Sequence, residues 1–179
     1  PLGCREIVLI GSLTSPSIWG LRPDLLTLKI LPQIAKAFMG GDNHLLSNIA
    51  KLVEEQGFAL RGAHEVAPEI LAPRGSLGRL MPDADDLANV ALGLDYLAAA
   101  GRFDIGQAAV VAGRHIVAVE AAEGTDGMLA RVATLRATGR IRAPRGVLDK
   151  APKPPQDRRF DLPSIGPTTV ASAAKAGLA

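Results

Sequence analysis

Hydrophobic and polar positions in the first 70 residues follow the order strand, helix, helix, strand. Continuous apolar runs that end at a turn residue are typical of buried strands, and apolar positions three or four residues apart are typical of helices. The predicted elements are a buried parallel-type strand at 5–11, a long loop at 12–24, a helix at 25–38 that is broken at Pro32, a helix from 42 to 56 that ends at Gly57, and a strand at 58–61. This order indicates the last part of an α/β unit.

The pattern changes after residue 66, where Pro68, Pro73, Gly75 and Gly78 predict a linker. We therefore expect an N-terminal domain at 1–70, a linker at 71–79 and a C-terminal domain at 80–179. The elements expected in the second domain are a helix at 83–100, strands at 108–112 and 115–120, a helix at 126–138, a short strand at 147–148 and a helix at 168–176.

Two details of the second domain follow from local spacing. The helix at 83–100 is expected to bury one apolar stripe, made of Leu87, Val90, Ala91, Leu94 and Leu97. The dipeptide Gly113-Arg114 is expected to join its two strands through a type II′ hairpin turn. The predicted fold class is α/β, with two small α/β units: an N-terminal Rossmann-like remnant and a C-terminal mixed α/β domain with a β-hairpin.

The composition limits the kinds of function. The chain is 47% hydrophobic but only 3% aromatic, and its formal net charge is +2, so neither a strong basic patch nor a stacking platform for nucleic acid is expected. A single cysteine, Cys4, excludes an internal disulfide framework and a cysteine-based zinc site. No apolar run is long enough to span a membrane as a helix. Because the chain starts at Pro1 and enters a strand almost at once, we expect it to be a fragment of a longer protein.

The turn at 120–126 holds three carboxylates and a hydroxyl between a predicted strand and a predicted helix. It holds Glu120, Glu123, Thr125 and Asp126. Carboxylates that lie together repel one another, and a cation or a ligand with donors would relieve that cost. The start of the helix also offers free backbone N–H groups to a phosphate. The alternative is a solvated turn in which Thr125 is the N-cap and Asp126 faces the helix dipole.

A second candidate is the segment 150–163, where basic residues precede Asp161. Its cations are Lys150, Lys153, Arg158 and Arg159. Asp161 lies between Phe160 and Leu162, and partial desolvation of its carboxylate would suit a metal ligand or a general base. An exposed charged loop is the alternative.

Two further polar positions are weaker candidates. Gln107 precedes the hairpin and either binds a polar group of a ligand or caps a strand. His64 and Glu65 are expected on a strand, where adjacent side chains point to opposite faces, so they are not a metal-binding pair. Because no P-loop, dinucleotide or nucleophile-elbow motif is present, the inventory favours metal-assisted chemistry on a phosphate ester.

Five motifs in order make the chain resemble a known family. They are Gly41-Asp42 with Leu45-Leu46, Gly62-Ala63-His64-Glu65, Asp104-Ile105-Gly106-Gln107, the 119–126 stretch with Glu123-Gly124-Thr125-Asp126, and Asp161-Leu162-Pro163-Ser164-Ile165-Gly166. The sequence resembles the UDP-2,3-diacylglucosamine pyrophosphatases of lipid A biosynthesis. The relevant type occurs in many Gram-negative bacteria that lack the calcineurin-like enzyme for this step.

The resemblance implies two α/β domains with the ligand between them. The implied reaction is hydrolysis of the UDP-lipid to 2,3-diacylglucosamine 1-phosphate and UMP, with Mg²⁺ or Mn²⁺ as the cofactor. The expected catalytic residue is Asp161, which matches the essential aspartate of the family's Asp-Leu-Pro motif. The expected substrate-binding residues are Thr125, Gln107, Lys150, Lys153 and His64, and the expected metal ligands are Asp126, Glu123 and Asp161. Thr125, Asp126 and Asp161 are expected to approach one another in the fold.

The resemblance also has departures and leaves a rival open. Asn43 and Gly127 replace residues that are usual in the family. Family members are expected to continue beyond both ends of this chain, with a Gly-rich segment before it. The rival is a non-catalytic module that binds a nucleotide-sugar or a phospholipid. The expected partners are the UDP-lipid and, peripherally, a membrane surface, but not nucleic acid. The expected location is the cytoplasm or the periphery of the inner membrane. A homodimer is left open.

Overall fold

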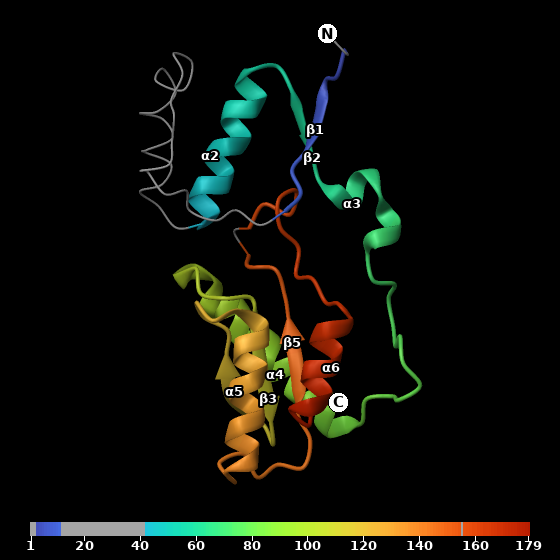
Figure 1. The fold of residues 1–179 in the computed structure, drawn as a ribbon, viewed down its shortest axis with the longest axis vertical. Helices are drawn as coiled ribbons and strands as arrows, with labels where there is room; N and C mark the ends of the chain where they lie inside the picture. The colour runs from blue at the N-terminus through green and yellow to red at the C-terminus, as the bar shows by residue number, and fades with distance from the viewer. Residues whose placement is uncertain (1–2, 12–41, 155) are drawn as a thin grey trace. The chain divides into compact units, whose positions relative to one another are not determined.

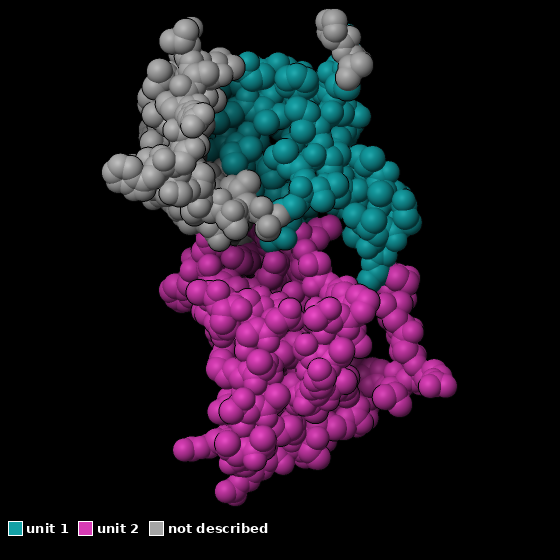
Figure 2. All heavy atoms as spheres, in the orientation of Figure 1, with its two compact units in different colours: residues 1–72, 157–161 teal, residues 73–156, 162–179 magenta. Residues whose placement is uncertain are grey.

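The fold is described from a computed structural model that covers residues 3–11, 42–154 and 156–179, with the backbone alone at 42–45. The chain divides into two compact units, Pro1–Ala72 with Asp157–Asp161 (unit 1) and Pro73–Gln156 with Leu162–Ala179 (unit 2) (Figure 2). The predicted loop at 12–24 and helix at 25–38 lie outside the described residues. None of the helices in the described ranges has the length and apolar character needed to cross a membrane.

Unit 1 contains a pair of parallel strands and a helix, as the hydrophobic pattern predicts (Figure 1). Its elements are β1 (Glu6–Val8), α2 (Asp42–Glu55), β2 (Ala59–Arg61) and α3 (Ala63–Val66). Ile7 lies opposite Leu60 in the parallel register. Helix α2 is followed by Gly57 at a φ of +84°, a conformation that glycine adopts without a Cβ penalty. The N–H of Phe58 then donates to the carbonyl of Val53 at 3.3 Å, which completes a glycine-type helix end.

The strand expected at His64 and Glu65 is wrong, because these residues belong to the single-turn helix α3. The N–H of Ala67 donates to the carbonyl of Ala63 at 2.9 Å and closes the turn, and Pro68 follows it. Two polar residues are too short a pattern to separate a strand from one helical turn. The local backbone hydrogen bonds decide the outcome.

Unit 2 is built on a three-stranded antiparallel sheet with the order β4-β3-β5. The strands are β3 (Ala108–Ala112), β4 (His115–Val119) and β5 (Val147–Lys150), and the helices are α4 (Ala84–Ala100), α5 (Gly124–Ala137) and α6 (Pro167–Lys175). Every residue of β3 is buried, and helices cover both faces of the sheet (Figure 1). A strand buried on both sides has a continuous apolar sequence, as Ala108–Ala112 has. The predicted α/β class is therefore confirmed.

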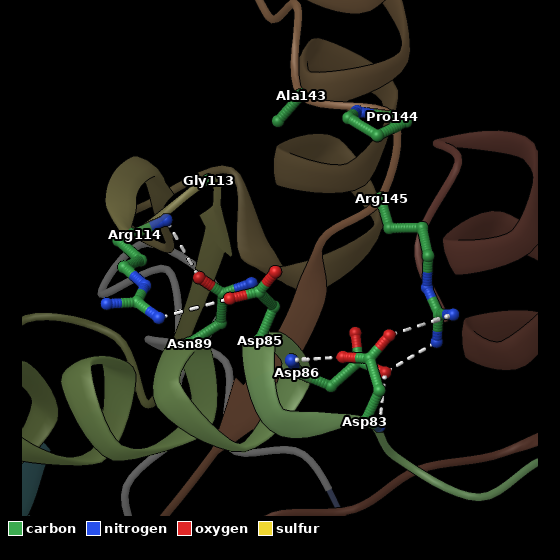
Figure 3. A pocket seen from close by; sticks show the side chains of 9 residues that line it. All are labelled: Asp83, Asp85, Asp86, Asn89, Gly113, Arg114, Ala143, Pro144 and Arg145. Atoms are coloured by element: carbon green, nitrogen blue, oxygen red, sulfur yellow. Dashed lines mark hydrogen bonds and ion pairs between the residues drawn. The ribbon is translucent and has the colours of Figure 1, made fainter.

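The hairpin between β3 and β4 is present, but the predicted turn type is wrong. Gly113 has a φ of 58° and Arg114 a φ of 63°, so both central residues are left-handed, as in a type I′ turn. An arginine is uncommon at such a position. Asn89 of α4 holds it there, because the N–H of Arg114 donates to Asn89 Oδ1 at 2.8 Å (Figure 3). A residue 25 positions away therefore determines the turn.

Helix α4 begins as expected, with Asp83 and Asp86 in a capping box, but its predicted buried stripe is wrong. Leu87 and Leu94 are 56% and 43% exposed, and only Leu97 of the expected stripe is fully buried. The residues of α4 that are buried are Asp86, Asn89, Gly93, Leu97 and Ala100. The helical period is predicted correctly, but a different face of the helix is buried. Polar residues on that face are buried because they bind partners elsewhere in the fold, which the apolar pattern does not indicate.

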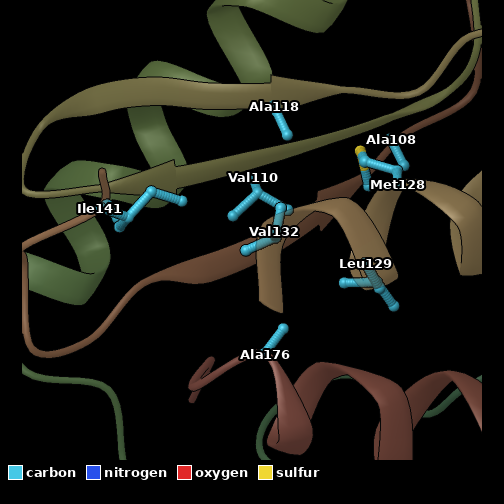
Figure 4. Close-up of a cluster of buried hydrophobic side chains, with 9 residues drawn as sticks. Ala108, Val110, Ala118, Met128, Leu129, Val132, Ile141 and Ala176 are labelled. Atoms are coloured by element: carbon cyan, nitrogen blue, oxygen red, sulfur yellow. The ribbon is translucent and has the colours of Figure 1, made fainter. Parts of the chain in front are cut away.

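The main core of unit 2 lies on the sheet face that α5 and α6 cover (Figure 4). Its buried members are Ala108, Val110, Ala112, Ala118, Met128, Leu129, Val132, Ile141 and Ala176. Leu148 of β5 packs against this cluster, so Lys150, two residues further on, points to the same face. Asp149 points to the opposite face, toward α4. The alternation of β5 thus directs Lys150 to the side where α5 begins.

Candidate functional site

The acidic turn at 120–126 lies between the end of β4 and the start of α5. Gly124 has a φ of 72° and is the first residue of α5, so a glycine suits this bend. The residue before the helix is Glu123, and Thr125 lies inside the first turn. The alternative in which Thr125 is the N-cap is therefore wrong. The three carboxylates of the turn, those of Glu120, Glu123 and Asp126, have different surroundings.

Glu120 is the inner carboxylate of the turn and is only 9% exposed. Its Oε2 accepts a hydrogen bond from the backbone N–H of Gln107 at 2.9 Å, and its Oε1 accepts one from Thr125 Oγ1 at 2.7 Å. Gly106 makes this approach possible, because a Cβ at Gly106 would lie 2.6 Å from Glu120 Cγ and 2.6 Å from its carbonyl oxygen. A buried carboxylate with two donors is well satisfied.

Lys150 joins the same network from β5. Its Nζ donates to Thr125 Oγ1 at 2.9 Å and to the carbonyl of Ser164 at 3.1 Å. A carboxylate only accepts and an ammonium group only donates, so the hydroxyl proton of Thr125 must point to Glu120 and its oxygen must accept from Lys150. An ammonium group has three protons, and two of them are used here. The third has no hydrogen-bond acceptor within the part of the chain that the structure describes, so it is available to an anionic ligand.

The two outer carboxylates of the turn do not join this network. Glu123 Oε1 pairs with Arg131 Nη2 at 2.6 Å, and a backbone hydrogen bond and this pair hold the pKa of Glu123 below its usual range. Gly127 accommodates the Glu123 side chain, because a Cβ there would lie 2.9 Å from Glu123 Cβ. Asp126 is exposed. Across residues 3–11, 42–154 and 156–179, no three His, Cys, Asp or Glu side chains are grouped so that they could hold a metal ion.

Lys153, the other expected lysine, has a partner of its own. Its Nζ pairs with Asp104 Oδ1 at 2.6 Å, and its side chain is only 14% exposed. Asp104 has a left-handed φ of 52° at the end of the short helix Gly101–Phe103. This pair fixes the segment after β5 to the loop before β3, so Lys153 has a clear structural role.

Asp161 and His64 belong to unit 1. Asp161 is half-buried at the end of the segment 157–161. Arg159 holds this segment to α2, because it pairs with Glu54 at 2.8 Å and with Asp157 at 2.7 Å. Gly62 lies close to both His64 and the segment 157–161: a Cβ on it would be 2.6 Å from His64 Cε1 and 3.2 Å from Arg159 Cα. Unit 1 thus brings His64 near the segment that ends in Asp161.

Some of the predicted site residues consequently come together in two groups, and Glu123, Asp126 and Lys153 belong to neither. In unit 2, the main chain of Gln107 and the hydroxyl of Thr125 both donate to Glu120, and Lys150 joins them through Thr125. His64 and the segment with Asp161 lie together in unit 1. The expected approach of Asp161 to Thr125 and Asp126 joins different units and stays a prediction.

A separate pocket of about 360 Å³ lies at the start of α4 (Figure 3). It is lined by Asp83, Asp85, Asp86, Asn89, Gly113, Arg114, Ala143, Pro144 and Arg145. Arg145 pairs with the buried Asp86, and Arg114 pairs with Asp85 at 3.1 Å. These charges satisfy one another and hold the hairpin and the 143–145 loop to α4, so the pocket has a structural explanation.

Sequence reasoning missed two members of the network in unit 2. Ser164 contributes a backbone carbonyl, which no side-chain pattern can reveal. Glu120 does not stand out from the other turn carboxylates in the sequence, although its position directly after β4 marks it as the inward one. The glycine at 106, three positions after the end of the short helix Gly101–Phe103 and next to Gln107, is the available signal for close packing.

Comparisons with known proteins identify the family of this chain. The family model described as the LpxI N-terminal domain matches residues 2–70, and the model described as the LpxI C-terminal domain matches residues 73–179. The UDP-2,3-diacylglucosamine pyrophosphatase LpxI of Caulobacter vibrioides is 46% identical over 179 residues, which is 99% of this chain and 64% of that protein. The chain thus spans less than two thirds of its relative. The resemblance seen in the motifs is confirmed, and the chain belongs to the LpxI family.

Proposed function

We propose that this protein hydrolyses the pyrophosphate bond of UDP-2,3-diacylglucosamine and releases UMP and 2,3-diacylglucosamine 1-phosphate. Two findings support the proposal: membership of the LpxI family, and the similarity to the UDP-2,3-diacylglucosamine pyrophosphatase of Caulobacter vibrioides. The reaction belongs to lipid A biosynthesis. Water attacks one phosphorus, the bond from that phosphorus to the bridging oxygen breaks, and the bridging oxygen leaves with the other phosphate.

The observation that carries the proposal is the ammonium group of Lys150, which is oriented by Thr125 and the carbonyl of Ser164 at 2.9 and 3.1 Å. An oriented cation with one N–H left over suits a phosphate oxygen on which charge develops as the bond breaks. Because the held geometry exists before the substrate arrives, little reorganisation is needed during the reaction. Lys150 is the proposed phosphate-binding group.

Thr125 and Glu120 hold Lys150 in this role. The hydroxyl of Thr125 is directed to Glu120, so we assign it to the positioning of Lys150 instead of direct donation to phosphate. The N–H of Gly124 donates to the carbonyl of Ala121 at 3.2 Å, and the N–H groups that follow it in the first turn of α5 are the proposed backbone donors for an anion.

Asp161 is the proposed general base. Its carboxylate would orient the attacking water and accept a proton from it. Support comes from the Asp-Leu-Pro motif, which this chain holds at residues 161–163. His64, next to the same segment within unit 1, is proposed to bind the substrate.

Mg²⁺ or Mn²⁺ is the proposed cofactor. The described donors do not form a protein-only metal cage, and Glu123 is engaged with Arg131. Mg²⁺ is commonly held through one or two carboxylates together with substrate phosphates, which suits the exposed Asp126, with Asp161 as a second ligand. When bound, the ion would polarise phosphoryl oxygens. Glu123 would take part only after its pair with Arg131 opens.

The location of the protein follows from the substrate in this proposal. A lipid with two acyl chains resides in a membrane, so the protein would act in the cytoplasm at the periphery of the inner membrane. A homodimer stays a prediction.

The test is the reaction itself. Purified protein with Mg²⁺ and UDP-2,3-diacylglucosamine in detergent micelles should release UMP with many turnovers. In water enriched in ¹⁸O, the label should enter only one of the two products and so identify the phosphorus that is attacked. Binding of the UDP-lipid without release of UMP would contradict the proposal and favour the binding module.

A further inference from the structure

We propose that the loop at residues 73–82 is a membrane-docking element that binds the surface of an anionic phospholipid bilayer. The proposal rests on the proposed function in one respect: a lipid substrate requires contact with a bilayer. The loop itself is argued from its composition, exposure and local structure. It runs between α3 and α4 and belongs to unit 2 (Figure 1).

Large apolar side chains of this loop are exposed to solvent. Leu77, Leu80 and Met81 are 73%, 80% and 73% exposed. These values are among the highest for large apolar residues of the described chain, and three such residues within five positions make a concentrated patch. A monomeric protein seldom leaves such a patch in water without a partner for it.

The charge of the loop selects the kind of partner. Arg74 and Arg79 are exposed, and no carboxylate lies between Glu69 and Asp83. Apolar side chains together with cations are the combination that inserts into the headgroup region of an anionic membrane. A protein partner would not require the complete absence of acids from this segment.

The local structure presents these side chains and keeps them off the core. Ser76 Oγ donates to the carbonyls of Gly78 and Leu80 at 3.1 and 3.2 Å, which closes a tight turn. A Cβ built on Gly75 would meet nothing within 4 Å. Pro73 and Pro82 at the ends oppose a helix or a central strand. The loop therefore has a defined shape that holds its apolar side chains outward.

The experiment measures binding of the protein to vesicles. Vesicles of phosphatidylethanolamine and phosphatidylglycerol at about 70:30 are compared with vesicles of phosphatidylcholine, by co-sedimentation at low and high salt. We expect binding to the anionic vesicles that falls at high salt, as electrostatic attraction is screened. The triple variant Leu77→Ser, Leu80→Ser, Met81→Ser and the double variant Arg74→Ala, Arg79→Ala should each bind at least tenfold more weakly.

Matched control variants change similar side chains elsewhere in unit 2. Ile165 and Val170 are each 60% exposed, and Ile165→Ser with Val170→Ser should leave vesicle binding unchanged. Arg140→Ala with Arg142→Ala tests the same loss of charge at other exposed positions. Circular dichroism and thermal melting verify that the variants fold.

Activity separates this inference from the proposed function. The loop variants should hydrolyse substrate in detergent micelles at the parent rate and substrate in anionic vesicles at least tenfold more slowly. Parent protein that binds anionic vesicles without releasing UMP would overturn the proposed function and leave the docking loop intact. Parent protein that does not bind them, or a triple variant that binds equally well, would overturn the docking loop.

Discussion

At the scale of single residues, Glu120 explains how one turn can be acidic without being a cluster of repelling charges. Each carboxylate of the turn has different surroundings: Glu120 has the backbone of Gln107 and the hydroxyl of Thr125, and Glu123 has Arg131. The sequence correctly marks the turn as important. It does not reveal this division, because the donors come from the loop before β3 and from the first and second turns of α5.

Two substitutions of Thr125 test the network. Thr125→Val keeps the shape of the side chain and removes the hydroxyl, and Thr125→Ser keeps the hydroxyl and removes the methyl group. Thr125→Val removes the acceptor of Lys150 and leaves Glu120 with one donor fewer, whereas Thr125→Ser keeps both hydrogen bonds. We expect kcat/KM to fall about 10–100-fold in Thr125→Val, which is less than the roughly 10²–10³-fold loss of a direct charge-stabilising contact because Thr125 acts through Lys150, and to change less than about threefold in Thr125→Ser. Steady-state UMP release measures both. Equal losses in the two variants would argue against a role for the hydroxyl.

Asp149 is a buried acid that the proposed reaction does not use. It is 5% exposed, and its Oδ2 has no hydrogen-bond partner within the described part of the chain. Burial raises the pKa of Asp149 from 3.8 to about 7. The folded protein therefore holds this proton between about pH 4 and pH 7, where the unfolded chain has released it. Stability from this group is present in full below pH 4 and is lost as the pH rises through 7.

The expected result is a pH-dependent difference between the parent and Asp149→Asn. The free energy of unfolding of the parent, relative to the variant, should fall between pH 4 and pH 7 by roughly 2–4 kcal/mol, since one pKa unit corresponds to about 1.4 kcal/mol. Urea denaturation at several pH values measures this. Asp85→Asn is the control, because Asp85 is exposed. A difference that does not change with pH would show that Asp149 is ionised in the folded protein.

At the scale of elements, α4 shows why an amphipathic pattern gives the period of a helix more reliably than its buried face. The sequence of α4 is rich in Leu and Ala on several sides, so several phases fit the apolar positions. The phase in the structure is fixed by Asp86, Asn89 and Gly93, whose partners are Arg145, Arg114 and Asp149. Each of these partners is distant in sequence, so the local pattern cannot supply them.

Gly93 gives a testable consequence of this packing. A Cβ at Gly93 would lie 2.0 Å from Asp149 Oδ2, so Gly93→Ala should destabilise the protein by about 2 kcal/mol. In an open helix the same change would stabilise it by up to about 1 kcal/mol. Because Asp149→Ala removes the two closest atoms, Gly93→Ala should cost much less in that background. Urea denaturation of the four proteins measures the coupling, and additive effects would contradict this contact.

The elements themselves were largely predictable. The strands at 108–112 and 115–119, the helices at 84–100 and 124–137 and the glycine end of α2 follow from apolar runs, caps and turn residues. The turn type expected at Gly113-Arg114 is wrong because Asn89 stabilises a left-handed arginine. The sequence does not predict the helix α3, because a single turn is too short to show a helical period of apolar residues.

At the scale of the whole molecule, the chain returns to unit 1 at 157–161, far from the rest of that unit in sequence. The pair between Arg159 and Glu54, 105 positions apart, ties this segment to α2. The sequence of 150–163 alone does not indicate that pair, because Glu54 lies in a distant helix. The family can be recognised from the sequence because its motifs are short and occur in a fixed order. Long-range contacts leave no such pattern in the sequence. The predicted domain bounds, metal ligands and catalytic assignment stay predictions.

The central claim is that Asp161 acts in hydrolysis of UDP-2,3-diacylglucosamine, and the most direct measurement is UMP release by Asp161→Ala. The parent protein, Asp161→Ala and the control Asp85→Ala are compared at equal folded concentration, with melting curves to verify folding. We predict that Asp161→Ala releases UMP at least about 10³-fold more slowly, because the attacking water loses its base and an expected metal ligand, and that Asp85→Ala is close to the parent. Release of UMP by Asp161→Ala at the parent rate would contradict the account.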